Sequence, residues 1–171
     1  MAAVIIEVVG NLANKLGIII MLVFFLSRIE VFKKLILKKI ISPYERILLA
    51  LIFGGMGILG TYSGVPIMGS IANSRIIAVM IAGILGGPVV GIGAGLIAGI
   101  HRWAVNIGGF TAVACGISTV IQGGIGGYLH RWVGNKKINY KYPLVAVIVA
   151  EMLEMLMILL IASPFSTALE V

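Results

Sequence analysis

Aspartate is absent from this 171-residue sequence, which holds one cysteine and two histidines. A single cysteine excludes a disulfide within the chain, and with two histidines it falls short of a zinc site. Without aspartate there is no Ser-His-Asp triad. The sequence also has no phosphate-binding loop ending in lysine and no dinucleotide-binding glycine fingerprint. We therefore expect no enzymatic activity and no metal or other cofactor.

Charge is also scarce, because charged residues make up 11% of the chain while hydrophobic residues make up 60%. Soluble domains carry about 25% charged and about 45–50% apolar residues. So short a chain cannot bury this much apolar surface in a soluble core, and a lipid bilayer is the solvent that suits it. The sequence predicts an all-α, polytopic membrane helical bundle that forms a single transmembrane domain over residues 1–171.

The apolar residues fall into six hydrophobic segments. These cover residues 4–26, 45–62, 71–87, 88–102, 110–129 and 143–161. No basic stretch precedes the first segment, as it would in a cleaved signal peptide, so we expect this segment to be retained. The third and fourth segments form one apolar stretch interrupted by Gly86-Gly87-Pro88. Proline removes a backbone donor and disfavours helix in the residue before it, which predicts a broken helical pair.

Most of the basic residues lie in two loops between these segments. They are Arg28, Lys33, Lys34, Lys38, Lys39 and Arg46, then Arg131, Lys136, Lys137 and Lys141. Such clusters follow the positive-inside bias and also suit anionic lipid headgroups, so they do not predict nucleic-acid binding. One continuous helix over 76–100 would put the two loops on opposite sides of the membrane. The broken pair, which we favour, puts both loops on the cytoplasmic side and both termini outside.

Arg75 and Arg102 are the arginines outside the basic loops. A charge in the bilayer core costs at least about 2.5–3.5 kcal/mol, so each needs a reason to be there. The broken-pair topology brings both to the outer end of the bundle. One interpretation is that two guanidiniums bind a small carboxylate through parallel hydrogen bonds. The other is that both side chains reach to the outer headgroups as anchors. Both interpretations stay open on this evidence.

The helix that follows these arginines begins beside them in the same topology. It carries Thr111, Cys115 and Ser118, and the last two share a helix face because they are three residues apart. The preceding Gly108-Gly109 leaves free N–H groups at the helix N-terminus, which favours an anion. A thiol or hydroxyl there would reach a keto oxygen next to a bound carboxylate.

Glu151 and Glu154 lie near the middle of the last segment. They would relay protons or pair with Lys15, or else form a neutral or hydrogen-bonded pair that fixes helix packing, which we favour. Small residues matter for packing as well. Glycines recur every fourth residue at positions 83, 87, 91, 95 and 99, a spacing that lets helix backbones approach closely in lipid.

Several motifs occur in a characteristic order along the chain. They are Glu45-Arg46, Gly60-Thr-Tyr-Ser-Gly-Val-Pro66, Asn73-Ser-Arg75, Gly86-Gly-Pro88, Gly99-Ile-His-Arg102, Gly108-Gly-Phe-Thr111 and Cys115-Gly-Ile-Ser118. This string resembles the LytS-type membrane sensor domain, the N-terminal part of bacterial LytS/YpdA-type histidine kinases. The resemblance runs from the first span to Glu154. That family is named for five transmembrane segments, one fewer than the six counted here.

The resemblance implies a receptor in the bacterial cytoplasmic (inner) membrane for an extracellular small carboxylate, which is pyruvate in the pyruvate-sensing members. Their two arginines, cysteine and serine correspond here to Arg75, Arg102, Cys115 and Ser118. Residues beside these motifs are further ligand-binding candidates: Asn73, His101, Gly109 and Thr111. Candidates for structural or coupling roles are Gly86, Gly87, Pro88, Glu151 and Glu154.

The resemblance also implies partners. Relatives signal as homodimers through a cytoplasmic kinase or other output domain, which this chain does not contain, so we expect either a truncated sensor module or a stand-alone one. Two alternatives remain. The chain would be the substrate-binding membrane component of a small-molecule transporter, or a structural protein without a ligand whose arginines are headgroup anchors.

Overall fold

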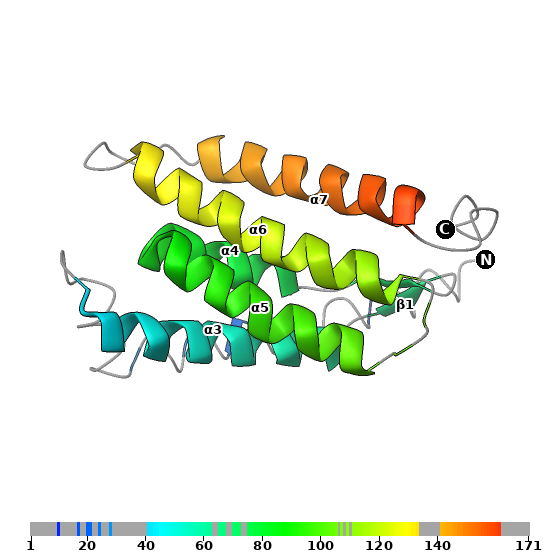
Figure 1. Cartoon of the computed structure of the whole chain (residues 1–171), viewed down its shortest axis with the longest axis horizontal. Coiled ribbons are helices and arrows are strands. Elements are labelled where there is room, and N and C mark those ends of the chain that lie inside the picture. Colours follow the sequence, from blue (N-terminus) through cyan, green and yellow to red (C-terminus); the bar gives the residue numbers. More distant parts are fainter. Residues whose placement is uncertain are drawn as a thin grey trace.

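The computed structural model describes five helices and one short β-hairpin. They are α3 (Pro43–Tyr62), β1 (Val65–Ile67), β2 (Ser70–Ala72), α4 (Arg75–Gly86), α5 (Pro88–Val105), α6 (Ala112–Val133) and α7 (Lys141–Ile161) (Figure 1). The described residues are 41–62, 65–67, 70–72, 75–105, 107, 109, 111–133 and 141–161, with positions 10, 17, 20, 21, 24 and 28. The predicted first span, 4–26, lies almost wholly outside them, as do Lys15 and most of the first basic loop.

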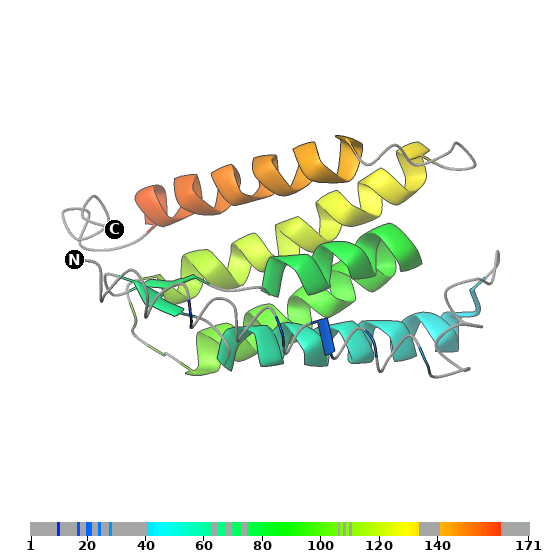
Figure 2. The same cartoon turned by 180° about the vertical axis from the view of Figure 1, so that it is seen from behind.

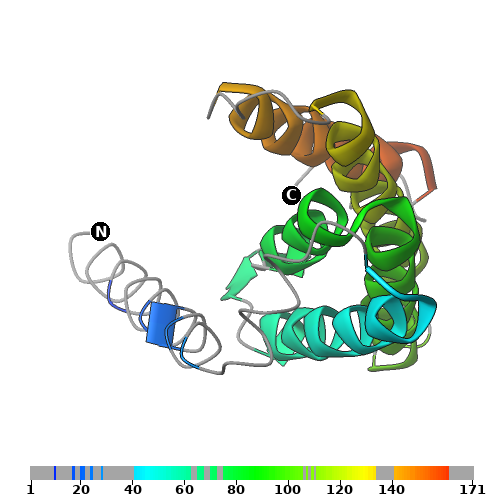
Figure 3. The ribbon, with the colours of Figure 1, turned by 90° about the vertical axis from the view of Figure 1, so that its left-hand side faces the viewer.

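Four of the described helices, α3, α5, α6 and α7, are long and apolar enough to cross a membrane, whereas α4 is shorter. The helical membrane bundle predicted from composition is confirmed in this part of the chain. α3, α5, α6 and α7 form a curved row in which each helix packs on the next, and α4 lies on the inner side of the row in contact with all four (Figures 2 and 3).

The predicted break between the third and fourth segments is confirmed. α4 ends at Gly86, α5 begins at Pro88, and Gly87 between them has a φ of 81°. Only glycine adopts this left-handed conformation readily, and proline suits the first position of the next helix. The turn is bridged by hydrogen bonds from Gly87 N to Gly83 O (2.8 Å) and from Gly91 N to Gly87 O (3.0 Å).

Replacing Gly87 by alanine should lower the free energy of unfolding by about 1–2 kcal/mol, because a Cβ is disfavoured at positive φ. The matched control is Gly55→Ala in α3, where nothing lies within 4 Å of an added Cβ. That change should be neutral or stabilising by about 0.5–1 kcal/mol. Reversible unfolding in mixed micelles would measure both variants. Equal stability of the two would show that the turn does not depend on glycine.

The described basic residues next to both loops lie at one end of the bundle. Arg46 lies in the first turn of α3, Arg131 in the last turn of α6, and Lys141 opens α7. The start of α3, the end of α6 and the start of α7 all lie at the end of the bundle where α4 turns into α5 (Figure 1). The positive-inside bias assigns this end to the cytoplasm. The opposite end, where α4 begins and α5 ends, is therefore the outer one.

One predicted boundary was wrong. Residues 71–87 were expected to be helical, but Ser70–Ala72 form β2, which pairs antiparallel with β1, and α4 begins at Arg75. Pro66 opposes Ile71 in this hairpin, and the β-branched residues at 65, 67 and 71 favour extended backbone. The all-α prediction is therefore corrected by a short hairpin next to α4.

This shortening of α4 determines how deep its first residue lies. A helix of 12 residues is about 18 Å long, well short of a hydrocarbon core of about 30 Å. Measured from Gly87, Arg75 lies about 18 Å and Arg102 about 22 Å along the helix axes at 1.5 Å per residue. The two arginines are therefore at nearly the same level along the bundle.

The predicted glycine packing is confirmed. Built on Gly91, a Cβ would collide with Gly123 O, and on Gly99 it would come within 2.6 Å of Gly116 O. Gly83 meets the α6 backbone in the same way, at 2.5 Å from Gly127 N. The glycines of α4 and α5 thus bring both helices into backbone contact with α6. Gly87 is the exception in the series, because it serves the turn.

Candidate ligand-binding site

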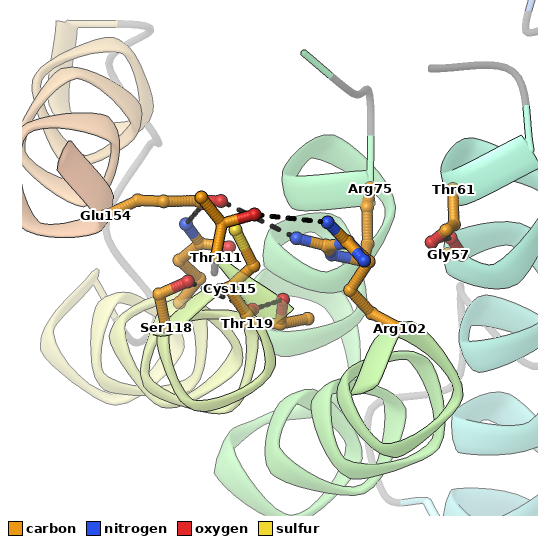
Figure 4. Close-up of polar contacts among 10 residues, drawn as sticks. Gly57, Thr61, Arg75, Arg102, Thr111, Cys115, Ser118, Thr119 and Glu154 are labelled. Carbon is orange, nitrogen blue, oxygen red and sulfur yellow. Dashed lines mark hydrogen bonds and ion pairs between the residues drawn. The ribbon is translucent and has the colours of Figure 1, made fainter. Parts of the chain in front are cut away.

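Arg75 and Arg102 lie side by side inside the bundle, as the broken-pair topology predicts. Arg75 opens α4 and Arg102 lies in the last turn of α5, and their side chains are 0% and 1% exposed. Their guanidinium groups face one another (Figure 4). Neither side chain reaches the outer surface, so the headgroup-anchor interpretation does not fit. Trp103, next to Arg102, is 47% exposed and has the position of an interface anchor.

The two arginines differ in what they bind within the protein. Arg75 Nη2 lies 3.5 Å from Glu154 Oε1, an ion pair that joins α4 to α7. Arg102 Nη2 donates to Thr111 Oγ1 at 3.4 Å, while its Nε and Nη1 are buried with no hydrogen-bond partner among the described residues. Buried donors are nearly always satisfied, and a charged one without a partner is costly. The free donors of Arg102 therefore indicate a place for an acceptor.

The first turns of α6 complete the cluster. Thr111 and Cys115 are buried beside the guanidiniums, and Cys115 interacts electrostatically with both arginines and with Glu154 (Figure 4). Ser118 is buried one turn further along α6, where its Oγ donates to Cys115 O at 3.1 Å. The i, i+3 spacing of Cys115 and Ser118 thus puts both on the protein-facing side of α6, as predicted. The thiol is free.

The remaining predicted ligand residues are not all brought to this cluster. His101 is half-buried and contacts Tyr62 instead, with 3.3 Å between Nε2 and the phenol oxygen and the two rings in an edge-to-face arrangement. Gly109 O accepts from Ala112 N at 3.0 Å and so helps to start α6. Asn73 lies outside the described residues.

Glu151 and Glu154 do not form the pair that their spacing predicts. Glu154 is 12% exposed and turned toward α4 and α6, whereas Glu151 is exposed on the outer side of α7. At about 100° per residue the two positions lie about 60° apart around the axis of α7, and only Glu154 faces the contact with α4 and α6. Glu154 instead contacts α6, where its Oε2 accepts from Gln122 Nε2 at 2.6 Å.

Gln122 was not identified from the sequence as part of this site. Its side chain is 1% exposed and holds Glu154 in place. The signal was available, because Gln122 lies four residues after Ser118 and seven after Cys115, on the same face of α6. Thr119 was missed as well; its Oγ1 donates to Cys115 O at 2.6 Å.

The cluster has the chemistry of an anion-binding site. It combines two guanidiniums, one carboxylate, a thiol and hydroxyls, all shielded from solvent. Hydrogen bonds from guanidinium to carboxylate are strong, and stronger away from water. Among the described residues, no group of histidine, cysteine and carboxylate side chains could hold a metal ion.

Comparison with known proteins identifies the domain type. The family model described as "5TMR of 5TMR-LYT" matches residues 29–171. The chain is 36% identical over 158 residues to the sensor histidine kinase YpdA of Escherichia coli K12, covering 92% of this chain. It is 39% identical over 167 residues to the sensor protein LytS of Bacillus anthracis, covering 86% of this chain. It is 36% identical over 162 residues to the sensor histidine kinase BtsS of E. coli K12, covering 92% of this chain.

The match is confined to part of each relative. The chain spans 28% of the length of YpdA, of this LytS and of BtsS. No solved structure matches the chain. The resemblance inferred from the ordered motifs is confirmed by the family model and by these relatives.

Proposed function

Because the chain belongs to the 5TMR-LYT family of membrane sensor domains, we propose that it senses a small carboxylate from the outer side of the membrane. It is a multi-pass domain of the bacterial cytoplasmic membrane, of the type found in two-component sensor histidine kinases. In the full-length protein the signal would pass, within a homodimer, to a cytoplasmic kinase or other output domain.

The observation that carries this proposal is the state of Arg102. Its guanidinium is 1% exposed, yet Nε and Nη1 find no acceptor in the described part of the chain. Arg75 lies beside it, on a different helix (Figure 4). A carboxylate bound between the two would accept hydrogen bonds from both and would draw α4 and α5 together. A ligand that binds one helix arrangement better than another shifts the equilibrium toward it.

Pyruvate fits the groups around the arginines. Its carboxylate would pair with Arg75 and Arg102. Its keto oxygen would accept a hydrogen bond from the Cys115 thiol, or from the Ser118 hydroxyl after that hydroxyl leaves Cys115 O. Thr111, which Arg102 already contacts, comes directly before α6. The methyl group of pyruvate would meet apolar side chains, of which the bundle has many.

Pyruvate should bind saturably to the purified chain in lipid nanodiscs. Ligand that binds the folded state at 100 times its dissociation constant adds about 2.7 kcal/mol to the free energy of unfolding. Titration calorimetry and thermal unfolding would measure both quantities. Methyl pyruvate, the uncharged ester, is the matched control and should give neither effect.

Two outcomes would contradict the receptor proposal. If neither pyruvate nor other small carboxylates such as lactate and acetate bind or stabilise the chain, the buried arginines have a structural role. If the chain instead carries labelled pyruvate across liposome membranes, it is a transport component, because a receptor moves no substrate.

A further inference from the structure

Glu151 is exposed in the middle of α7. It is the central residue of this helix, about 15 Å from either end at 1.5 Å per residue. Among the exposed side chains of α7 from Leu144 to Leu160, it is the only polar one. It interacts electrostatically with Arg75 and Glu154 but makes no hydrogen bond or ion pair within the described part of the chain. A carboxyl group is therefore exposed where the bilayer is least polar.

Lipid is a poor neighbour for this side chain. Ionisable residues in membrane spans almost always face other protein or a water-filled cavity, and glutamate is too short to reach headgroups about 15 Å away. α7 is the last helix of the curved row, so α6 and α4 pack on one side of it (Figure 3). Only 22% of its membrane-spanning stretch is buried. We therefore expect another protein surface to cover the side of α7 that carries Glu151.

The exposed residues around Glu151 have the spacing of a helix-pairing stripe. Leu144, Ile148, Glu151 and Met155, here named the α7 seam, are separated by four, three and four residues. This is the spacing of the core positions of a coiled coil, and all four residues are exposed. Two helices that meet through such a seam cross at about 20°, the common arrangement in membrane bundles. A single polar residue in a seam fixes the register of the two helices.

The chemistry of Glu151 favours an identical partner. In a two-fold symmetric dimer, a residue near the axis lies close to the same residue of the other copy. A protonated carboxyl group both donates and accepts hydrogen bonds, whereas lysine and arginine side chains only donate. Two carboxyl groups that share one proton therefore satisfy each other. Glutamate is a self-complementary residue at this position.

We infer that the α7 seam is the interface with a second copy of this chain, in which Glu151 hydrogen-bonds Glu151 of the partner subunit. This inference rests on the proposed function, which includes a homodimer but not the face that forms it. α7 also carries Glu154, which pairs with Arg75. The helix at the interface thus contacts the arginine cluster, and a shift of α4 on ligand binding would be passed to the partner subunit.

Disulfide crosslinking in bacterial membranes tests the interface. Cys115 would be replaced by serine, and single cysteines would be introduced by Ile148→Cys or Met155→Cys. A disulfide needs Cα atoms within about 7 Å of each other, so both variants should form covalent dimers under mild oxidation. Ile117→Cys, on the exposed side of α6, is the matched control and should stay monomeric.

Substitutions at Glu151 separate the carboxyl group from the rest of the seam. E151V should raise the dissociation constant of the dimer about tenfold, the effect of losing one hydrogen bond between membrane helices. E151Q still donates and accepts, so its constant should stay within about threefold of wild type. Leu156→Val, an exposed change on α7 outside the seam, should also stay within about threefold. Energy transfer between labelled chains, diluted stepwise in liposomes, would measure the constants.

Three results would overturn the inference. They are equal crosslinking of the Ile117→Cys and Ile148→Cys variants, an E151V dimer as stable as wild type, and a disulfide within one chain that carries Lys15→Cys and Glu151→Cys. The last would show that the first hydrophobic segment, rather than a second copy, covers Glu151.

Carboxylate binding is measured separately from the interface. If the seam does not crosslink but the wild type binds pyruvate, the interface is wrong and the receptor proposal stands. If the seam crosslinks as expected but no carboxylate binds, the interface stands and the ligand proposal fails.

Discussion

Pyruvate binding should be lost when Arg102 is replaced by alanine, with the affinity falling at least about 100-fold. The structural reason is that Arg102 brings buried donors to the site that have no acceptor among the described residues. Arg75 pairs with Glu154, and Nε and Nη1 of Arg102 are buried without a partner in the described residues. Titration calorimetry of the variant in nanodiscs would measure the loss.

The control for this prediction is a distant arginine. Arg46→Ala, at the cytoplasmic end of α3, removes the same charge from the chain and should leave pyruvate affinity unchanged. Arg102→Lys keeps the charge but cannot make two parallel hydrogen bonds, so its affinity should fall between the two. Helix content and elution volume should match the wild type in all three. A folded R102A variant that binds pyruvate as tightly as wild type would remove Arg102 from the site.

The second large effect concerns the contact between α5 and α6. Gly123→Ala should lower the free energy of unfolding by about 3 kcal/mol, because an added Cβ meets Gly91 O and neither helix can give way without separating from the other. The clash involves backbone on both sides, so no side-chain rotation relieves it. Reversible unfolding in mixed micelles would give the value, or the variant would fail to accumulate as folded protein.

The neighbouring glycine is a matched control. At Gly124 the nearest atom to an added Cβ is Ile92 Cγ1 at 3.9 Å, which is ordinary contact. Gly124→Ala should therefore be neutral or stabilising by about 0.5–1 kcal/mol through helix propensity. If G123A is as stable as G124A, the two helices are not packed as closely as the glycine contacts indicate.

Much of the architecture follows from local chemistry in the sequence. Gly86-Gly87-Pro88 requires a break because proline cannot continue a helix from the preceding turn, and the break alone brings Arg75 and Arg102 to the same end of the bundle. Clustered basic residues then give the orientation. The spacing of Cys115 and Ser118 correctly predicts that they share a face of α6, and both residues are buried.

Features that depend on tertiary contacts could not be predicted in the same way. The composition of residues 70–72 is compatible with the first turn of a helix. They form a strand because they pair with β1. Helical periodicity predicts which residues share a face of a helix. It does not predict which neighbouring helix that face contacts. This is why Glu154 and Glu151 were treated as a pair, although one contacts Gln122 and Arg75 and the other is exposed.

The central claim, that Arg75 and Arg102 together hold a carboxylate, can be tested by solid-state NMR. Pyruvate labelled with ¹³C at its carboxylate would be bound to chain whose arginine guanidiniums carry ¹⁵N, and carbon–nitrogen dipolar dephasing would be recorded. We predict strong dephasing that corresponds to about 4 Å, reduced by half in R102K because one labelled guanidinium is lost. Bound pyruvate whose carboxylate shows no dephasing, or the same dephasing in R102K, would contradict the account.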